Sequence, residues 1–362
     1  MSRYNDSLIP PIVILISLGL VMVFSASSNP FSDNVSGLSV FVKQFRWLVL
    51  GFIFLVICSL MNYRKLIDFS TPLLFISIFI ALIAYFTSQE ASTARWLKLF
   101  GINIFQTSEF VKIAVIIFTA SFIDQNKRKI KDSNFMIRNY YPYLFLAVMV
   151  VLFQPDLSSS IMISGIAFCM LFIAGIDLKQ IKTLFLILFL ALLIKFFLMP
   201  NITGSENYQN QRFSGFVAGK APQQDNAVNS IAEGGIFGVG FGESRWKGDY
   251  VAEPQTDFIY SVITSELGVL GLLILSAGFL MILIRGVNII RNSKDLFGMF
   301  LAMGITFNLI FYFIIHVGYN VGILPTTGLP LPFVSYGGSH TLFNLSQVGL
   351  LLSISHKIKN ET

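Results

Sequence analysis

Acidic side chains at the ends of apolar stretches are the first candidates for chemistry in this chain. Asp257 stands in the run Glu-Pro-Gln-Thr-Asp-Phe-Ile, residues 253–259, directly before an apolar stretch. A carboxylate at a membrane edge can accept a proton from a substrate hydroxyl or hold a divalent cation. An acid in the first turn of a helix also complements the helix dipole, so a capping role for Asp257 is the competing interpretation.

Other ionisable residues lie within apolar stretches, where a charge is costly without a partner. Glu266 follows Asp257 by nine residues, which at about 100° per residue puts it on the opposite helix face. The two carboxylates therefore form no acid/base pair, and we expect Glu266 to have a structural hydrogen-bonding role. Glu109 and Lys112 are spaced to pair on one helix face, as an ion pair or as part of a site. Asp156 is predicted to cap a helix.

A cationic cluster is predicted in the polar segment 200–256, formed by Arg212, Lys220, Arg245 and Lys247. Charged residues in a loop are usually only solvated. The membrane topology does not require cations on the outer side, so a second interpretation is that they bind an anion. Arg and Lys are the usual partners of a phosphate or pyrophosphate group.

Glycines also gather in this segment, at positions 234, 235, 238, 240 and 242. They resemble a phosphate-binding loop only superficially, because no βαβ unit surrounds them. Two interpretations stay open. Their backbone amides could approach an anion, or the glycines could form a re-entrant turn at the membrane surface.

The composition places all these residues in a membrane protein. Hydrophobic residues are 54% of the 362 and charged residues only 12%, against about 25% charged residues in a soluble protein. Such a chain cannot cover itself with a solvated surface, which excludes a secreted or cytosolic enzyme and a disordered scaffold. The net charge of +6 does not indicate nucleic acid, because the basic residues flank apolar stretches. Cys58 and Cys169 lie inside such stretches and are expected to pack as small apolar groups.

We predict an all-α integral membrane fold, a single polytopic domain over residues 1–362. About ten transmembrane helices are expected, with a large extracytoplasmic loop at about 200–256 between the seventh and the eighth. A span needs about 20 apolar residues, and apolar runs with few charges supply them. The predicted helices cover residues 8–27, 46–62, 71–88, 106–123, 140–154, 157–175, 181–199, 257–284, 297–317 and 335–356.

Lys and Arg placement predicts the orientation in the membrane. With a cytoplasmic N-terminus, the inner segments hold basic clusters such as residues 127–131. The short outer loops then hold only Lys43, Arg46, Arg95 and Lys98. Both termini are therefore expected in the cytoplasm.

A proline-rich segment, residues 324–332, interrupts the longest charge-free run. Its three prolines are incompatible with a helix. Non-helical backbone at membrane depth is tolerated where it is buried in protein or lines a cavity, so this loop is predicted to shape a pocket.

Blocks along almost the whole chain, in order, resemble the SEDS family, the FtsW/RodA peptidoglycan polymerases. No single block is decisive, but six or more in order carry the resemblance. They are residues 19–27 (GLVMVFSAS), Arg95-Trp96-Leu97, residues 106–112 with Gln106, Glu109 and Lys112, residues 154–157 (QPDL), Tyr208 to Gly240, residues 253–259, residues 266–268 (ELG) and residues 324–339 (LPTTGLPLPFVSYGGS).

The resemblance implies a glycosyltransferase that polymerises lipid II into glycan strands outside the membrane by an inverting mechanism. Asp257 occupies the place of the family's essential Asp, as a base or a ligand to a divalent cation such as Mg or Mn. Lipid II, the nascent glycan strand, membrane lipids and a class B penicillin-binding protein transpeptidase are the implied partners. Substrate-binding positions are then expected at Arg212, Lys220, Arg245, Lys247, Arg95, Glu109, Lys112, Ser335, Gly337 and Gly338.

The chain departs from the family pattern at Thr107, at Gln255, which replaces the usual His, and at His316, where Asn is common. The first span and the region of Lys247 favour the FtsW branch, whereas Thr327 and residues 330–333 favour RodA. We favour FtsW.

Two other functions are compatible with the sequence. A lipid II flippase or transporter would use ionisable groups near the midplane, and Glu109 and Lys112 fit that requirement. A non-catalytic scaffold for the transpeptidase would leave Asp257 dispensable. Glycan synthesis by the purified protein, and leaflet-resolved transport in liposomes, separate the three.

Overall fold

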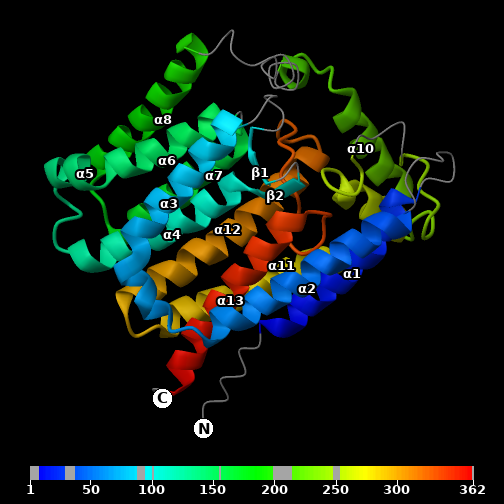
Figure 1. Cartoon of the computed structure of the whole chain (residues 1–362). Helices are drawn as coiled ribbons and strands as arrows, with labels where there is room; N and C mark the ends of the chain where they lie inside the picture. The colour runs from blue at the N-terminus through cyan, green and yellow to red at the C-terminus, as the bar shows by residue number, and fades with distance from the viewer. Residues whose placement is uncertain are drawn as a thin grey trace. The chain divides into compact units, whose positions relative to one another are not determined.

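The computed structural model of the chain describes residues 8–28, 37–87, 94–99, 102–154, 156–198, 214–247 and 253–360. These residues are mostly helical (Figure 1). Contacts divide the chain into two compact units, each made of three segments. The first unit is Met1–Ile57, Gln209–Gly286 and Leu309–Val348, and the second is Cys58–Tyr208, Val287–Asn308 and Gly349–Thr362.

Each of the ten predicted helices overlaps a helix of the structure. The helices are α1 (Ile9–Ser27), α2 (Gly37–Leu60), α3 (Leu66–Thr87), α4 (Thr107–Asn126), α5 (Ser133–Asn139), α6 (Tyr141–Phe153), α7 (Leu157–Ala174), α8 (Leu178–Leu198), α10 (Pro222–Gly234), α11 (Ile259–Asn292), α12 (Leu296–Asn320) and α13 (Gly338–Asn360).

The all-α membrane class is confirmed, but the count of ten spans is not. Among the described residues, six helices are long and apolar enough to cross a membrane, or seven if α5 and α6, bent by 46°, form one span. Several elements of the structure were not predicted, among them the short helix α5, and two of them matter for the site. One is α10, and the other is a hairpin of β1 (Trp96–Leu99) and β2 (Ile102–Gln106), antiparallel with an irregularity between Leu97 and Lys98.

In the second unit, α4 lies at the centre of the packing and contacts α3, α6 and α7 (Figure 1). Nearly every side chain from Thr107 to Ile123 is buried. A helix that is covered on all sides needs mostly apolar residues on all sides. In α4 the buried exceptions are Glu109, Lys112 and four small hydroxyl residues, Thr107, Ser108, Thr119 and Ser121. The hairpin leads directly into α4, and the Thr107 amide donates to the Arg95 carbonyl over 3.0 Å.

In the first unit, glycines allow helices and loops to approach closely. A Cβ on Gly19 of α1 would stand 2.6 Å from Val334 Cα, and one on Gly51 of α2 would stand 2.6 Å from a Leu345 methyl group. Helix α11 is broken at Gly268, which has φ 59° and ψ −146°. Only glycine adopts such a conformation without strain.

The turn between α11 and α12, in the second unit, is organised around Asp295. Its carboxylate accepts hydrogen bonds from Tyr63 Oη at 2.6 Å, from the Gly298 amide at 2.7 Å and from Arg64 Nη2 at 2.9 Å. Burial by itself would raise the pKa of Asp295, but the bonds from Tyr63, Gly298 and Arg64 together lower it below its ordinary value. The charged carboxylate is thus the stabilised form.

Asp295→Asn is expected to lower thermal stability at neutral pH and to matter less in acid. A lowered pKa in the folded state stabilises the fold above the unfolded-state pKa of about 4, and this contribution is lost as the pH falls through the folded-state value. Hydrogen bonds to a charged group contribute about 1.5–3 kcal/mol. Thermal unfolding in detergent is measured at pH 7 and at pH 3. The difference in Tm between the variant and the unmodified protein should be smaller at pH 3. Asp68→Asn, at an exposed position of the same unit, is the control. An equal difference in Tm at both pH values would contradict a stabilising role of the charged Asp295 carboxylate.

Candidate active site

Asp257 lies in a turn that precedes α11. Glu253 starts this turn with φ 52°, and its carbonyl accepts the amides of Thr256 and Asp257, each at 3.0 Å. The helix begins only at Ile259, and Asp257 is half-buried. The turn therefore places the carboxylate ahead of the helix, at a partly accessible position.

Three successive carbonyls of this turn accept hydrogen bonds from α12 and from the loop that follows it. The Tyr336 amide donates to Gln255 O at 2.9 Å, and Ser335 Oγ donates to Thr256 O at 2.7 Å. Asp257 O accepts from Tyr319 Oη at 2.6 Å and from Asn320 Nδ2 at 3.3 Å. These contacts fix the backbone on which the Asp257 side chain is mounted.

The proline-rich segment 324–332 is non-helical, as predicted. The non-helical backbone extends from Val321 to Gly337, so the last helix begins at Gly338 and not at the predicted residue 335. Its predicted substrate positions have internal contacts. Ser335 is buried, and its hydroxyl also accepts the Leu331 amide at 2.8 Å. The Gly337 amide donates to Gln44 Oε1 at 3.1 Å. A Cβ on Gly338 would stand 2.5 Å from the Trp47 ring. Packing thus explains these residue types without a substrate.

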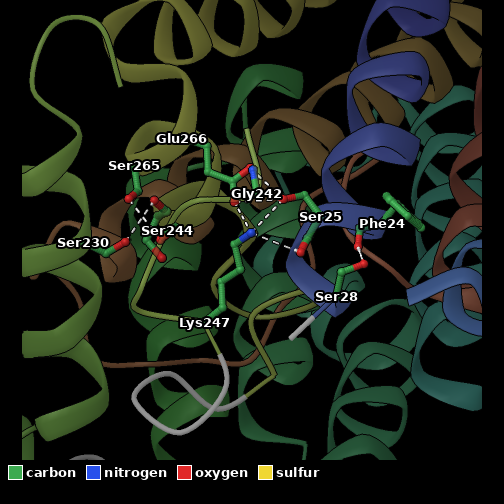
Figure 2. A network of polar contacts seen from close by, with 10 residues as sticks. Phe24, Ser25, Ser28, Ser230, Gly242, Ser244, Lys247, Ser265 and Glu266 are labelled. Atoms are coloured by element: carbon green, nitrogen blue, oxygen red, sulfur yellow. Dashed lines mark hydrogen bonds and ion pairs between the residues drawn. The ribbon is translucent and has the colours of Figure 1, made fainter. Parts of the chain in front are cut away.

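A buried charge network lies beside this turn in sequence (Figure 2). Lys247 Nζ pairs with the Glu266 carboxylate and donates to Ser25 Oγ at 2.8 Å. Ser25 Oγ lies 2.7 Å and 2.8 Å from the two Glu266 oxygens, one of which also accepts the Gly242 amide at 3.0 Å. The predicted structural hydrogen bonding of Glu266 is confirmed. Lys247, a predicted pyrophosphate contact, has a side chain that is only 3% exposed and is paired within the chain.

The glycine-rich loop is docked on the break in α11. The Val239 amide donates to Ser265 O at 2.9 Å, and the Val269 amide donates to Ile236 O at 3.1 Å. Gly238 and Gly268 meet backbone to backbone, since a Cβ on either would collide with main-chain atoms at 2.1–2.4 Å. The anion that meets a glycine amide here is a carboxylate of the chain itself, Glu266, at Gly242.

The other cations of the outer segment are in different environments. Arg245 is largely exposed and pairs with Glu233 at 2.6 Å. Lys220 is exposed. Arg212 lies outside the described residues. Two predicted cations, Lys220 and Arg245, are therefore accessible to a ligand. The ion pair of Arg245 with Glu233 does not prevent this, because an exposed ion pair contributes little to stability.

The second unit has its own buried polar centre. Lys112 pairs with Glu109 at 3.1 Å, as the spacing predicted. Asp156 caps α7 by accepting the Ser159 amide at 3.1 Å, which confirms the capping prediction, and it also accepts from Ser108 Oγ at 2.8 Å. Arg95, another predicted substrate residue, is exposed.

Buried amide side chains contribute to both units and were missed in the sequence. Gln154 accepts from Thr107 Oγ1 at 2.9 Å and donates to Ala81 O at 2.7 Å. Gln44 donates to Ser335 O at 3.3 Å, and Gln224 of α10 donates to Tyr319 O at 2.8 Å. A polar amide inside an apolar run is the signal that could have found them, because a buried amide needs partners.

Within the described part of the chain, no group of three or more His, Cys, Asp or Glu side chains could hold a metal ion. Mg²⁺ is commonly held by one or two carboxylates together with substrate phosphates. Asp257 as a single carboxylate would therefore suit a cation shared with a phosphorylated substrate.

The family model described as Cell cycle protein, which covers FtsW, RodA and SpoVE, matches residues 6–360. The chain is 32% identical to the protein named Probable peptidoglycan glycosyltransferase FtsW of Geobacter metallireducens, over 99% of this chain and 96% of that one. It is 33% identical to the protein of the same name from Bacillus subtilis, over 99% and 92%. Stage V sporulation protein E of Bacillus subtilis is 31% identical, over 95% and 94%.

Solved structures share the fold. A chain of a peptidoglycan synthase complex, from a study of how polymerization and crosslinking are coordinated, matches with a TM-score of 0.78 at 23% identity over 99% of both chains. The rod shape determining protein RodA of Thermus thermophilus matches with a TM-score of 0.71 at 21% identity over 98% of both. The apolar helices and these matches together make the chain a multi-pass protein of the bacterial inner membrane, and it belongs to the FtsW/RodA/SpoVE family.

Proposed function

We propose that the chain is a peptidoglycan glycosyltransferase that polymerises lipid II into glycan strands in cell division or cell-shape maintenance. The observation that carries the proposal is the match, over nearly the full length of both chains, to proteins named peptidoglycan glycosyltransferase FtsW. The FtsW branch is favoured for the same reason. The held turn that presents Asp257 supplies a candidate for the chemistry.

In the proposed reaction, Asp257 takes the proton from a hydroxyl of the acceptor sugar. The oxygen of that hydroxyl attacks the anomeric carbon of the donor at the same time. The new glycosidic C–O bond forms while the bond from the anomeric carbon to the polyprenyl pyrophosphate breaks. The pyrophosphate leaves with the electron pair of that bond. A single displacement of this kind inverts the anomeric centre. Asp257 then returns the proton to solvent.

Anionic and lipidic parts of the substrates need partners as well. Lys220 and Arg245 are exposed cations that suit the pyrophosphate, with Arg212 as a third candidate outside the described residues. Arg95 and the buried pair Glu109–Lys112 stay candidates for substrate contacts in the second unit. A divalent cation bound by Asp257 would supply charge neutralisation at the leaving pyrophosphate.

A transpeptidase partner and a defined topology complete the proposal. A likeness in fold to a chain of a peptidoglycan synthase complex supports a class B penicillin-binding protein as partner. The Lys and Arg distribution supports both termini in the cytoplasm and the segment 200–256 outside. The polyprenyl tails would then lie in the membrane among the helices.

Purified chain mixed with lipid II, with and without the transpeptidase, tests the proposal. Glycan strands resolved on a gel are the expected product. A preparation that is folded, supplied with the partner and divalent cations, and still forms no strands would contradict it. Movement of lipid II between leaflets of liposomes without any strands would favour the transporter.

A further inference from the structure

We infer that Tyr319 and His316 of α12 act as a positioning pair that holds Asp257 for the reaction. The inference rests on the proposed function, because it assumes that Asp257 is the base. Neither residue needs to touch the substrate. Their contribution is to fix the backbone carbonyl of Asp257, and through it the direction of the carboxylate.

Tyr319 is the stronger contact. It is fully buried, and its hydroxyl lies 2.6 Å from Asp257 O and 3.1 Å from Leu329 O. Its ring meets the ring of Phe258 edge to face, with centroids 5.9 Å apart. Because Phe258 is the neighbour of Asp257 in the chain, Tyr319 holds this turn by both a hydrogen bond and a packed ring.

His316 sets the direction of the Tyr319 hydroxyl. It lies one helical turn before Tyr319, and its Nδ1 atom is 2.8 Å from Leu329 O and 2.9 Å from Tyr319 Oη. A carbonyl oxygen only accepts, so this geometry requires Nδ1 to carry the hydrogen. With Nδ1–H directed at Leu329 O and Tyr319 Oη, the Tyr319 hydrogen is left for Asp257 O. The Nε2 atom is buried and has no hydrogen-bond partner among the described residues.

Two buried amide side chains, Asn320 and Gln224, add hydrogen bonds around Tyr319. Asn320 Nδ2 donates to His316 O at 2.8 Å as well as to Asp257 O at 3.3 Å. Gln224 of α10 donates to Tyr319 O at 2.8 Å and to Leu324 O at 2.7 Å. Through Gln224, helix α10 is thus hydrogen-bonded to the end of α12 that carries Tyr319 and to the loop that follows it. A rigid mount matters because misplacing a catalytic group by about 1 Å can cost about 100-fold in rate.

Tyr319→Phe tests the pair by removing only the hydroxyl. We expect kcat for glycan synthesis to fall about tenfold or more while KM for lipid II stays within about twofold. Tyr140→Phe in the second unit is the matched control. Tyr140 is also fully buried, and among the described residues its hydroxyl bonds to Thr119 Oγ1 at 2.8 Å. The control should lose stability to a similar degree and keep its kcat.

Two substitutions of His316 test the role of Nδ1. Asparagine places an amide nitrogen where Nδ1 lies, whereas glutamine places it where Nε2 lies. His316→Asn should therefore keep a kcat close to that of the unmodified protein, and His316→Gln should lose about as much as Tyr319→Phe. The double variant His316→Gln/Tyr319→Phe should be no slower than Tyr319→Phe alone, because both changes remove the same contact.

Each result supports or overturns the inference. An unchanged kcat in Tyr319→Phe overturns it, and so does an equal loss of kcat in Tyr140→Phe, which would show a general effect of stability. If Tyr319→Phe does not fold, the comparison of His316→Asn with His316→Gln decides, and equal losses in both overturn the pairing. Retained glycan synthesis in Asp257→Asn would remove Asp257 as the base and overturn the pair with it, while leaving the proposed function in place; only the absence of strands with the unmodified protein would overturn that function. An inactive Asp257→Asn beside a fully active Tyr319→Phe would overturn the positioning pair alone.

Discussion

Asp257→Asn is expected to abolish glycan synthesis in a protein that still folds and enters the membrane. Asparagine has nearly the same size as aspartate, and the bonds that hold the turn go to backbone carbonyls, so the turn should survive. What is lost is the ability to accept a proton. A general base contributes about 10²–10⁴-fold to a rate, so we expect strand formation to fall by at least about 100-fold.

This substitution also separates catalysis from capping. Asparagine is as good as aspartate at a helix N-cap, so a residue that only capped α11 would tolerate the change with full activity. Initial rates of strand formation from purified lipid II are the measurement, with thermal unfolding to verify the fold. Asp225→Asn, at an exposed position of α10, is the matched control and should keep the normal rate. Full activity of Asp257→Asn would remove Asp257 from the mechanism.

Glu266→Gln and Lys247→Met are each expected to lower the free energy of unfolding by about 3–5 kcal/mol. Most of the protein should then no longer fold. Either change leaves a buried charge without its counterion, which is far costlier than losing the pair as a whole. Ser25 and the Gly242 amide would still contact residue 266, but neither carries a compensating charge. The double variant Lys247→Met/Glu266→Gln removes both charges together, and much of the stability should return.

Thermal unfolding and the yield of monodisperse protein in detergent measure this effect. Arg245→Met provides the comparison at an exposed ion pair, where we expect a loss of no more than about 1 kcal/mol. Similar losses at Lys247 and Arg245 would mean that the buried pair is not a major source of stability. So would a double variant as unstable as the sum of its single changes.

Much of the helical framework could be predicted, because charge-free apolar runs have few other solutions in a membrane. Helix α10 could not, since its polar composition indicates a loop and its contacts, such as Gln224 with Tyr319, come from distant sequence. The prediction of Asp257 as a site residue stays open to experiment. The environment of Lys247 could not be predicted because its partners depend on tertiary structure. Ser25 is 222 residues away, and nothing near Lys247 in sequence indicates that a serine of α1 meets it.

The docking of the glycine-rich loop on the break in α11 has a consequence for amide exchange. The amides of Val239 and Gly240 donate to Ser265 O and Glu266 O, and the amide of Val269 donates back to Ile236 O. These three amide protons cannot exchange with deuterated solvent unless the two segments separate. The loop amides of Val239 and Gly240 should thus exchange as slowly as the amides of the helix beneath them, with loop and helix opening in one concerted event.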